Sequence, residues 1–187
     1  MEHIGTIKIE TEKIILRRFV DSDAEAMFCN LYSDAEAMRF LPWETHTGIF
    51  ETKKHISGYI DGYENQDFYA WAIVTKDSKE PIGFIDTLVD NTINAIKVDY
   101  GIGKPWWNKG YTSKALSALI CFAFERVKAN RVYATHDPRN PNSGKVMIKC
   151  GMTYEGTLRH ARYRKGEYSD RAMYAILAND YSYTKKT

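Results

Sequence analysis

Three β-rich runs follow one another in the middle of the chain and lead into a long helical pattern. The runs are Tyr69 to Thr75, Pro81 to Val89 and Ala95 to Ile102, and short polar turns separate them. Strands joined by such short turns pair as an antiparallel meander. The segment from about Tyr111 to Val127 then places its apolar residues on one helix face. A meander that continues into an amphipathic helix predicts a layered domain of sheet and helices.

The segments on either side of the meander complete the expected order of elements. Before it, the pattern predicts a strand at 14–18, a helix after Asp21-Ser22-Asp23, a short helix after Ser33-Asp34 and a helix at 47–63. After the long helix, it predicts a strand at 131–135, a short helix at 140–150 and a hairpin of 152–161 with 168–177 around Lys165-Gly166. One strand–helix–strand unit is expected to form a parallel pair. The fold class is therefore α/β, a mixed and mostly antiparallel sheet of about seven strands flanked by about four helices.

The composition is that of a single globular domain. With 187 residues, of which 44% are hydrophobic and 27% charged, the chain can bury a core without disulfides or a structural metal. We expect one domain over residues 1–187, with its core at about 14–178. The net charge of +2 gives no reason to expect nucleic-acid or membrane binding.

The histidines, cysteines and apolar runs point to a cytoplasmic protein without metal. The five histidines show no metal-ligand spacing, so no metal site is predicted. The three cysteines are odd in number and far apart, which is typical of reduced thiols. The most apolar stretch, about Ala115 to Phe124, is far shorter than the roughly 20 residues that cross a bilayer.

The connection between the third run and the long helix has the properties of an anion-binding loop. It runs from Gly103 to Gly110 and contains Lys109 near its end. A helix N-terminus offers unpaired N–H groups and a partial positive charge to a phosphate, and Gly110 has no side chain to block the ligand. The sequence contains neither a dinucleotide fingerprint nor a Walker motif. An ordinary strand-to-helix connection is the alternative for this loop alone.

Four ordered pieces of the chain resemble one family. They are 100–115 (Tyr-Gly-Ile-Gly-Lys-Pro-Trp-Trp-Asn-Lys-Gly-Tyr-Thr-Ser-Lys-Ala), Asn140-Pro141-Asn142-Ser143, 150–156 (Cys-Gly-Met-Thr-Tyr-Glu-Gly), and 165–170 (Lys-Gly-Glu-Tyr-Ser-Asp) followed by Tyr174. With the strand order, they resemble the GNAT superfamily of N-acetyltransferases, and within it the branch of Rim-type ribosomal-protein N-terminal acetyltransferases. The likeness covers Ile14 to Leu177. It implies a single GNAT-like domain whose sheet is splayed between its fourth and fifth strands.

The resemblance implies acetyl-CoA as co-substrate and assigns residues to it. Backbone groups of the fourth strand would pair with the pantetheine arm, as an added strand does, and the loop and helix start would hold the pyrophosphate. The cofactor-binding residues implied are Asp99, Tyr100, Gly101, Ile102, Trp107, Asn108, Lys109, Gly110, Tyr111, Thr112, Ser113, Asn140 and Ser143. The chain departs from the usual family pattern at Trp107 and Thr112, and it has Lys97 where many relatives carry a glutamate. The first departure leaves backbone binding intact, whereas the second leaves the general base open.

Acetyl transfer needs an unprotonated amine, a stabilised oxyanion and a proton for the departing thiolate. By resemblance, Ser143 is the first choice for the acid and Tyr154 the second, and the backbone N–H near Ile102 would bind the oxyanion. Asn140 and Ser143 could instead cap the helix that starts there. Asp86, Asp99 and Glu155 are the candidate bases, but the phase of strand alternation is not fixed by the sequence. We therefore take Ser143, Tyr154 and Glu155 as the catalytic candidates.

The pocket that binds the amine acceptor is expected between the first helices and near the last hairpin. In relatives the segment around Trp43 and Glu44 lines the acceptor pocket, so we take these residues and Asp86 as substrate-binding. A packed tryptophan and a solvated glutamate are the alternatives. The densest basic run is 159–165 (Arg-His-Ala-Arg-Tyr-Arg-Lys), in which alternation turns Arg162 and Arg164 to one face. Such runs are often solvated, or they contact an acidic partner or a coenzyme A phosphate.

The resemblance implies transfer of an acetyl group from acetyl-CoA to a primary amine by direct attack in a ternary complex. The branch favours a protein N-terminal α-amine, whose pKa of about 8 makes deprotonation cheaper than for lysine by roughly 3 kcal/mol. A small amine such as a polyamine, amino acid or antibiotic is the alternative acceptor. A non-catalytic module that senses acyl-CoA is the alternative of a different class. The sequence leaves open whether the chain forms a homodimer.

Overall fold

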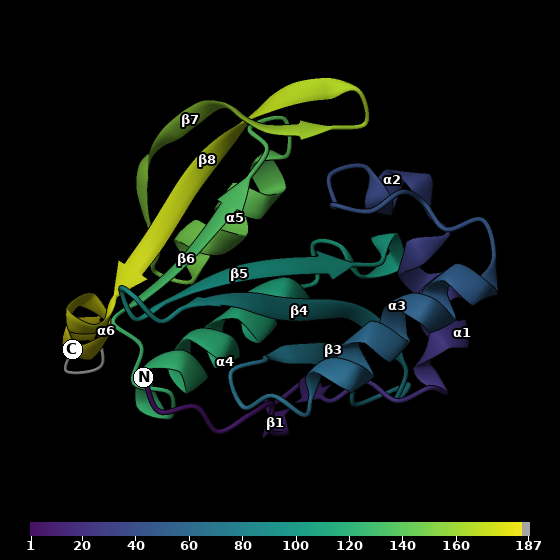
Figure 1. Ribbon diagram of the computed structural model, residues 1–187, viewed down its shortest axis with the longest axis horizontal. Coiled ribbons are helices and arrows are strands. Elements are labelled where there is room, and N and C mark those ends of the chain that lie inside the picture. The colour runs from purple at the N-terminus through teal and green to yellow at the C-terminus, as the bar shows by residue number, and fades with distance from the viewer. Residues whose placement is uncertain (185–187) are drawn as a thin grey trace.

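The computed structural model describes residues 1–184, and these contain an eight-stranded sheet in the order β1-β2-β3-β4-β5-β6-β8-β7 (Figure 1). The strands are β1 (Ile9–Glu10), β2 (Ile14–Arg17), β3 (Ala70–Thr75), β4 (Pro81–Asp90), β5 (Ala95–Ile102), β6 (Arg131–His136), β7 (Thr153–Arg164) and β8 (Glu167–Leu177). All neighbours are antiparallel except β5 and β6. The predicted mixed sheet, its meander and its hairpin around Lys165-Gly166 are confirmed. The additional strand, β1, is too short to show a period.

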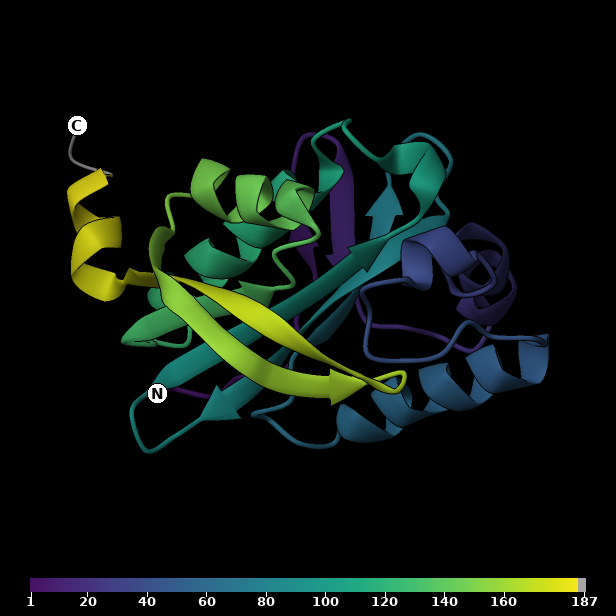
Figure 2. The same ribbon diagram turned by 90° about the horizontal axis from the view of Figure 1, so that it is seen from above.

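Helices cover both faces of the sheet. They are α1 (Asp23–Met27), η1 (Phe28–Tyr32), α2 (Ala35–Met38), α3 (Ile49–Gly62), η2 (Lys104–Trp106), α4 (Tyr111–Glu125), α5 (Pro141–Lys149) and α6 (Ala178–Thr184). Figure 2 shows α3 on one face and α4 with α5 on the other. The described part of the chain has six α-helices against about four expected: α1 to α5 lie where the sequence pattern places helices, and α6 follows the last strand. No helix within it is long and apolar enough to cross a membrane.

Two cores result from the alternation of side chains along the central strands. On the α4 face, Trp71 and Ile85 join a cluster with Leu116 and Ile120. On the other face, Ala72 and Phe84 pack with residues of α1, η1 and α3. All residues of β3 are buried, because a strand in the middle of a sheet covered on both faces has no solvated side.

The sheet opens between β5 and β6. These strands pair over Ala95–Val98 and Arg131–Ala134 only. Beyond that point, 99–102 stay paired with β4, whereas Thr135 and His136 pair with β8. The predicted splay between the fourth and fifth predicted strands is therefore confirmed, and it leaves one edge of β5 without a strand partner.

Gly103 fixes the loop that follows this open edge. Its N–H donates to the Ile82 carbonyl at 2.9 Å, and a Cβ at this position would lie 2.0 Å from the Asn30 carbonyl oxygen and 2.9 Å from the Trp106 ring. A side chain here would displace backbone, which is costlier than displacing a flexible side chain. The close approach of η1 therefore holds the loop in place.

We predict that Gly103→Ala lowers the free energy of unfolding by about 1–3 kcal/mol, the usual cost of overpacking. Gly58→Ala is the matched control, because Gly58 lies in α3 with nothing within 4 Å of an added Cβ. This second change should raise the free energy of unfolding by about 0.5–1 kcal/mol, since glycine weakens a helix interior. Denaturant titration measures both values. Equal effects of the two substitutions would contradict the packing described for Gly103.

Candidate active site

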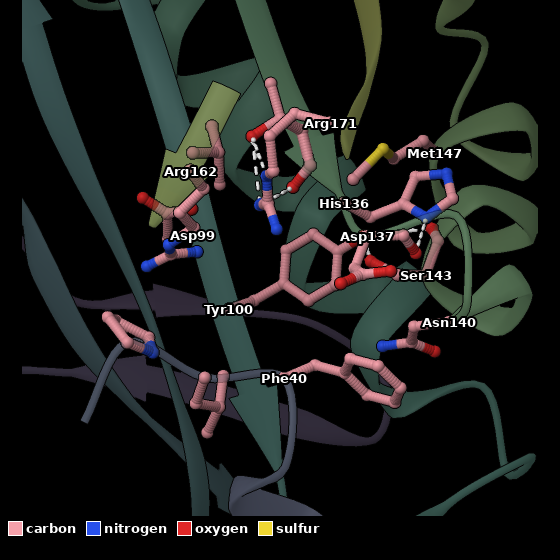
Figure 3. A pocket seen from close by; sticks show the side chains of 14 residues that line it. Phe40, Asp99, Tyr100, His136, Asp137, Asn140, Ser143, Met147, Arg162 and Arg171 are labelled. Carbon is pink, nitrogen blue, oxygen red and sulfur yellow. Dashed lines mark hydrogen bonds between the residues drawn. The ribbon is translucent and has the colours of Figure 1, made fainter. Parts of the chain in front are cut away.

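The separated ends of β5 and β6 form the walls of a cavity (Figure 3). Four parts of the chain surround it: the connection after α2, the end of β5, the segment from β6 into α5, and the β7–β8 hairpin. The lining residues are Phe40, Leu41, Pro42, Val98, Asp99, Tyr100, Thr135, His136, Asp137, Asn140, Ser143, Met147, Arg162 and Arg171. Asp99, Tyr100, Asn140 and Ser143, four residues predicted to bind the cofactor, are thereby brought together.

Tyr100 and Ser143 form a hydrogen-bonded pair across the gap. The Tyr100 Oη lies 3.0 Å from the Ser143 Oγ and 3.0 Å from the Ser143 carbonyl oxygen. Burial raises the pKa of Tyr100, and the bond to Ser143 opposes that rise only in part. The phenol therefore stays protonated and acts as a donor. The pair can supply a proton into the cavity through either hydroxyl.

Asn140 faces the cavity instead of capping its helix. It stands at the start of α5, but its side chain makes no capping hydrogen bond, and Pro141 follows it as the first helical residue. Its backbone N–H donates to the Asp137 carbonyl at 2.7 Å, which fixes the turn. The capping role considered for Asn140 is therefore wrong, and its amide is free to bond a ligand in the cavity (Figure 3).

The loop after β5 ends in an uncapped helix. Gly110 has φ +82°, with nothing within 4 Å of an added Cβ, and Asn108 also adopts a left-handed conformation. No side chain caps α4, and its first backbone bond in this turn runs from the Lys114 N–H to the Gly110 carbonyl. The N–H groups at 111–113 are thus available to a ligand, with open space above Gly110. Such a helix start suits a phosphate, so these residues fit a coenzyme A pyrophosphate.

Trp107 ties this loop to the open edge of β5. Its Nε1 donates to the Ile102 carbonyl at 2.9 Å, which orients the loop against the end of the strand. Lys109 and Asn108 are exposed. Thr112 and Ser113 lie in the first turn of α4 beside Tyr111, which packs partly against the core.

Two carboxylates lie next to each other on the face of the sheet opposite to the Tyr100 side chain. Asp86 on β4 is directly across from Asp99 on β5, so both side chains point to the same face, the one that α3 covers. The Tyr59 Oη donates to Asp86 Oδ2 at 2.8 Å, and Lys97 Nζ lies 2.6 Å from Asp99 Oδ2. Burial raises the pKa of Asp86 to about 7; the Tyr59 bond opposes this rise, and the charge of Asp99 adds to it.

The segment predicted to line the acceptor pocket lies near the cavity. The residues of this segment that line the cavity are not the predicted ones, however. Trp43 packs edge-on against Phe84, with ring centroids 5.4 Å apart, and the Glu44 carboxylate lies 3.5 Å from the Lys165 ammonium. Neither residue lines the cavity, whereas Phe40, Leu41 and Pro42 do. Their run of apolar residues in a connecting segment was the signal that could have identified them.

Tyr154 and Glu155 lie away from the cavity. The Glu155 carboxylate forms a two-point ion pair with Arg131, at the end of β6 remote from the opening. This pairing lowers the pKa of Glu155, and a tightly paired carboxylate is a poor proton acceptor. Tyr154 is half exposed, and its Oη lies 2.8 Å from the Thr157 Oγ1. Neither residue lines the cavity between β5 and β6, so the geometry gives no support to the catalytic roles expected for them.

The structure adds four ionisable residues to the cavity that motif reasoning missed. His136 ends β6, Asp137 follows it, and Arg162 and Arg171 come from the hairpin. The His136 Nδ1 donates to the Asp137 carbonyl at 2.8 Å. Only Arg162 had a signal, the alternation of the basic run. Within residues 1–184 no group of three or more His, Cys, Asp or Glu side chains gathers into a potential metal site.

Comparison with known proteins agrees with this geometry. The family described as "Acetyltransferase (GNAT) domain" matches residues 13–153. The uncharacterized N-acetyltransferase YoaA of Bacillus subtilis is 29% identical over 171 residues, 90% of this chain and 96% of that protein. The ribosomal protein uS5-alanine N-acetyltransferase of Escherichia coli is 26% identical over 191 residues, 96% and 95% of the two chains.

A solved GNAT-family acetyltransferase from Bacillus anthracis has the same fold. The two structures superpose with a TM-score of 0.82 at 25% identity, over 92% of this chain and 99% of that one. The chain therefore belongs to the GNAT family, as its motifs indicated, and it is an acetyl-CoA-dependent N-acetyltransferase.

We predict that Gly110→Ala weakens acetyl-CoA binding about tenfold, equivalent to about 1.4 kcal/mol. A residue with a Cβ disfavours the left-handed conformation by roughly 1–2 kcal/mol, and relief of that strain would turn the first N–H groups of α4 away from the ligand. Isothermal titration calorimetry with acetyl-CoA measures the change.

Gly166→Ala is the matched control, because Gly166 has φ +78° and equally open space, at the tip of the β7–β8 hairpin. Both substitutions should lower the free energy of unfolding by about 1 kcal/mol, but only the first should affect acetyl-CoA. Unchanged affinity in Gly110→Ala would argue against this loop as the pyrophosphate site.

Proposed function

We propose that the chain acetylates a primary amine by direct attack in a ternary complex, with Asp86 as the proton acceptor and the Tyr100–Ser143 pair as the proton donor. One observation carries the proposal. Asp86 and Asp99 lie on one face of the open β5 edge, and Tyr100 lies on the other, where it contacts Ser143 of α5. This arrangement lets an amine lose a proton on one face while the thiolate gains one on the other.

The cofactor supplies the activated acetyl group, and the chain supplies its alignment. The Gly103 N–H points to β4, so strand alternation turns the N–H groups of Tyr100 and Ile102 toward the gap. There they can pair with a pantetheine arm laid along β5 and bind the negative charge that develops on the carbonyl oxygen. Asn140 adds a side-chain amide on the opposite wall.

Asp86 has the properties of a base that works at neutral pH. A carboxyl with a pKa of about 7 is roughly half ionised there, which balances its availability against its basicity. Asp86 does not line the cavity itself, but Asp99, directly across from it, does, so a bound amine would pass its proton to Asp86 through a water. Lys97 neutralises Asp99, so the two carboxylates divide into a paired one and an unpaired one.

A protein N-terminal α-amine is the acceptor that we favour. It has the lower pKa of the common amines, and the uS5-alanine acetyltransferase similar to this chain acts on a ribosomal protein, as its name states. A small-molecule amine is the alternative acceptor. We also infer a cytoplasmic location, because all three cysteines are free, as is typical of a reducing compartment.

We predict that turnover of the wild-type chain at saturating substrates rises with pH through about 7 and then levels off. The sign follows from the role of Asp86: a raised pKa keeps this carboxyl protonated below about pH 7, and only the ionised form accepts a proton. Asp86→Asn should remove this rising limb of the pH profile and lower kcat about 100-fold, the lower end of general-base effects. Release of the coenzyme A thiol, followed with N-terminal peptides and small amines, measures turnover.

Tyr59→Phe sharpens this test. Because the Tyr59 bond lowers the pKa of Asp86, its loss should move the limb to higher pH while the plateau is kept. A limb that stays near pH 7 in both variants would show that another group titrates. Tight acetyl-CoA binding without turnover of any amine would favour the alternative function, a non-catalytic module that senses acyl-CoA.

A further inference from the structure

A second, strongly basic cavity adjoins the first. Its lining residues are Arg39, Phe40, Asp137, Arg139, Arg162, Arg164, Lys165, Glu167, Ser169 and Arg171. Phe40, Asp137, Arg162 and Arg171 line both cavities, so the two spaces are continuous. Figure 3 shows Arg162 and Arg171 reaching into the shared region near Tyr100 and Asp99.

The acidic residues of this cavity are already paired. Arg139 Nη2 lies 2.7 Å from Asp137 Oδ2 and 2.9 Å from Glu167 Oε1. Lys165 has only a long contact of 3.5 Å with the exposed Glu44. Among the residues that the structure describes, the other cations of the cavity make no ion pair with a carboxylate. These are Arg39, Arg162, Arg164 and Arg171.

Two of these arginines are largely enclosed by the protein. Arg171 is 9% exposed and donates to the Thr135 carbonyl and hydroxyl. Arg164 donates to the Trp43 carbonyl at 2.6 Å, but its Nε is buried without a partner. Burial and then the charge of Arg162 lower the pKa values of Arg164 and Arg171, and the charges of Glu44 on the first and of Asp99 and Asp137 on the second oppose this only in part. An anion bound between these partly buried like charges would stabilise them.

The cavity is separate from the loop that suits the pyrophosphate. None of the residues 104–113 lines it. It is bounded by the hairpin tip and by the connection after α2, which the Arg164–Trp43 bond holds together. This position is on the acceptor side of the opening, beyond Phe40.

We propose that the basic cavity binds an acidic group of the acceptor, a carboxylate or a phosphate, so that the favoured substrate is an amine that also carries a negative charge. This inference rests on the proposed function. Guanidinium groups bind both anions through paired hydrogen bonds, and the continuity of the two spaces lets one molecule reach both. The acid is either a residue close behind a protein N-terminus or a group of a small amine.

Matched acceptors test this inference. One pair consists of N-terminal peptides that differ only by Glu or Gln at the second and third positions, and the other consists of an amino acid and its amide. We expect kcat/KM to be about 10-fold or more higher for the acidic member of at least one pair, the usual scale for a charge-assisted bond. The pair that shows the preference identifies the source of the acid.

Arg162→Gln and Arg39→Gln should bring this ratio down toward one. Arg159→Gln is the matched control, because Arg159 is exposed on the same strand as Arg162 and lies outside both cavities. It should keep the wild-type ratio. Inorganic phosphate, titrated by calorimetry, should bind the Arg162→Gln variant more weakly than the wild-type chain, which gives a readout independent of turnover.

Three results would overturn the inference. Equal kcat/KM for the acidic and neutral members of both pairs would refute it while the proposed function stands. Loss of acetyl-CoA affinity in Arg162→Gln, as large as the loss of acceptor selectivity, would assign the cavity to the cofactor. If no amine is acetylated although acetyl-CoA binds, the proposed function fails, and the inference fails with it.

Discussion

The site depends on the parting of β5 and β6 after four paired residues. A backbone that leaves its partner strand exposes polar groups, and these need other partners. The structure supplies them with side chains: Trp107 bonds the Ile102 carbonyl, and Arg171 bonds the Thr135 carbonyl. Meanwhile β6 continues along β8, and β5 remains on β4. The opening is thus stabilised from both sides.

This opening also divides the chemistry between the two faces of the sheet. Alternation along one strand turns Asp99 toward α3 and Tyr100 toward α5. The helix packing then gives each side its own environment. Tyr59 of α3 bonds Asp86, and Ser143 of α5 bonds Tyr100. The same strand pairing therefore gives Asp86 a pKa near neutrality and keeps the Tyr100 phenol protonated. The backbone at these residues is not strained.

Much of the fold could be predicted because its signals are local. The meander, the apolar stripe of α4 and the Lys165-Gly166 turn each show in a short window of sequence. β1 has two residues and no period, and the π-helical turn η1 follows α1 without a break in the pattern, so neither could be predicted.

The candidate site was predictable only where a motif carried it. The loop at 107–113 and the pair Asn140 and Ser143 came from matched segments. Glu155 lay in such a segment too, yet its partner Arg131 is 24 residues away, and no local pattern reveals that pairing. The sequence likewise did not show to which face of the sheet the Asp86 side chain points. The contact with Tyr59 in the structure shows it. Side chains that meet across long separations, such as Arg171 and Thr135, need the tertiary structure.

We propose that acetyl-CoA lies along the open edge of β5 with its pyrophosphate at the start of α4. Amide hydrogen exchange, measured with and without saturating acetyl-CoA, tests it directly. Bound in this way, acetyl-CoA should slow exchange at Tyr100 and Ile102 and at 110–113, with little change in β1 and α3. Protection confined to other segments, or none at 99–102 and 110–113 although the ligand binds, would contradict it.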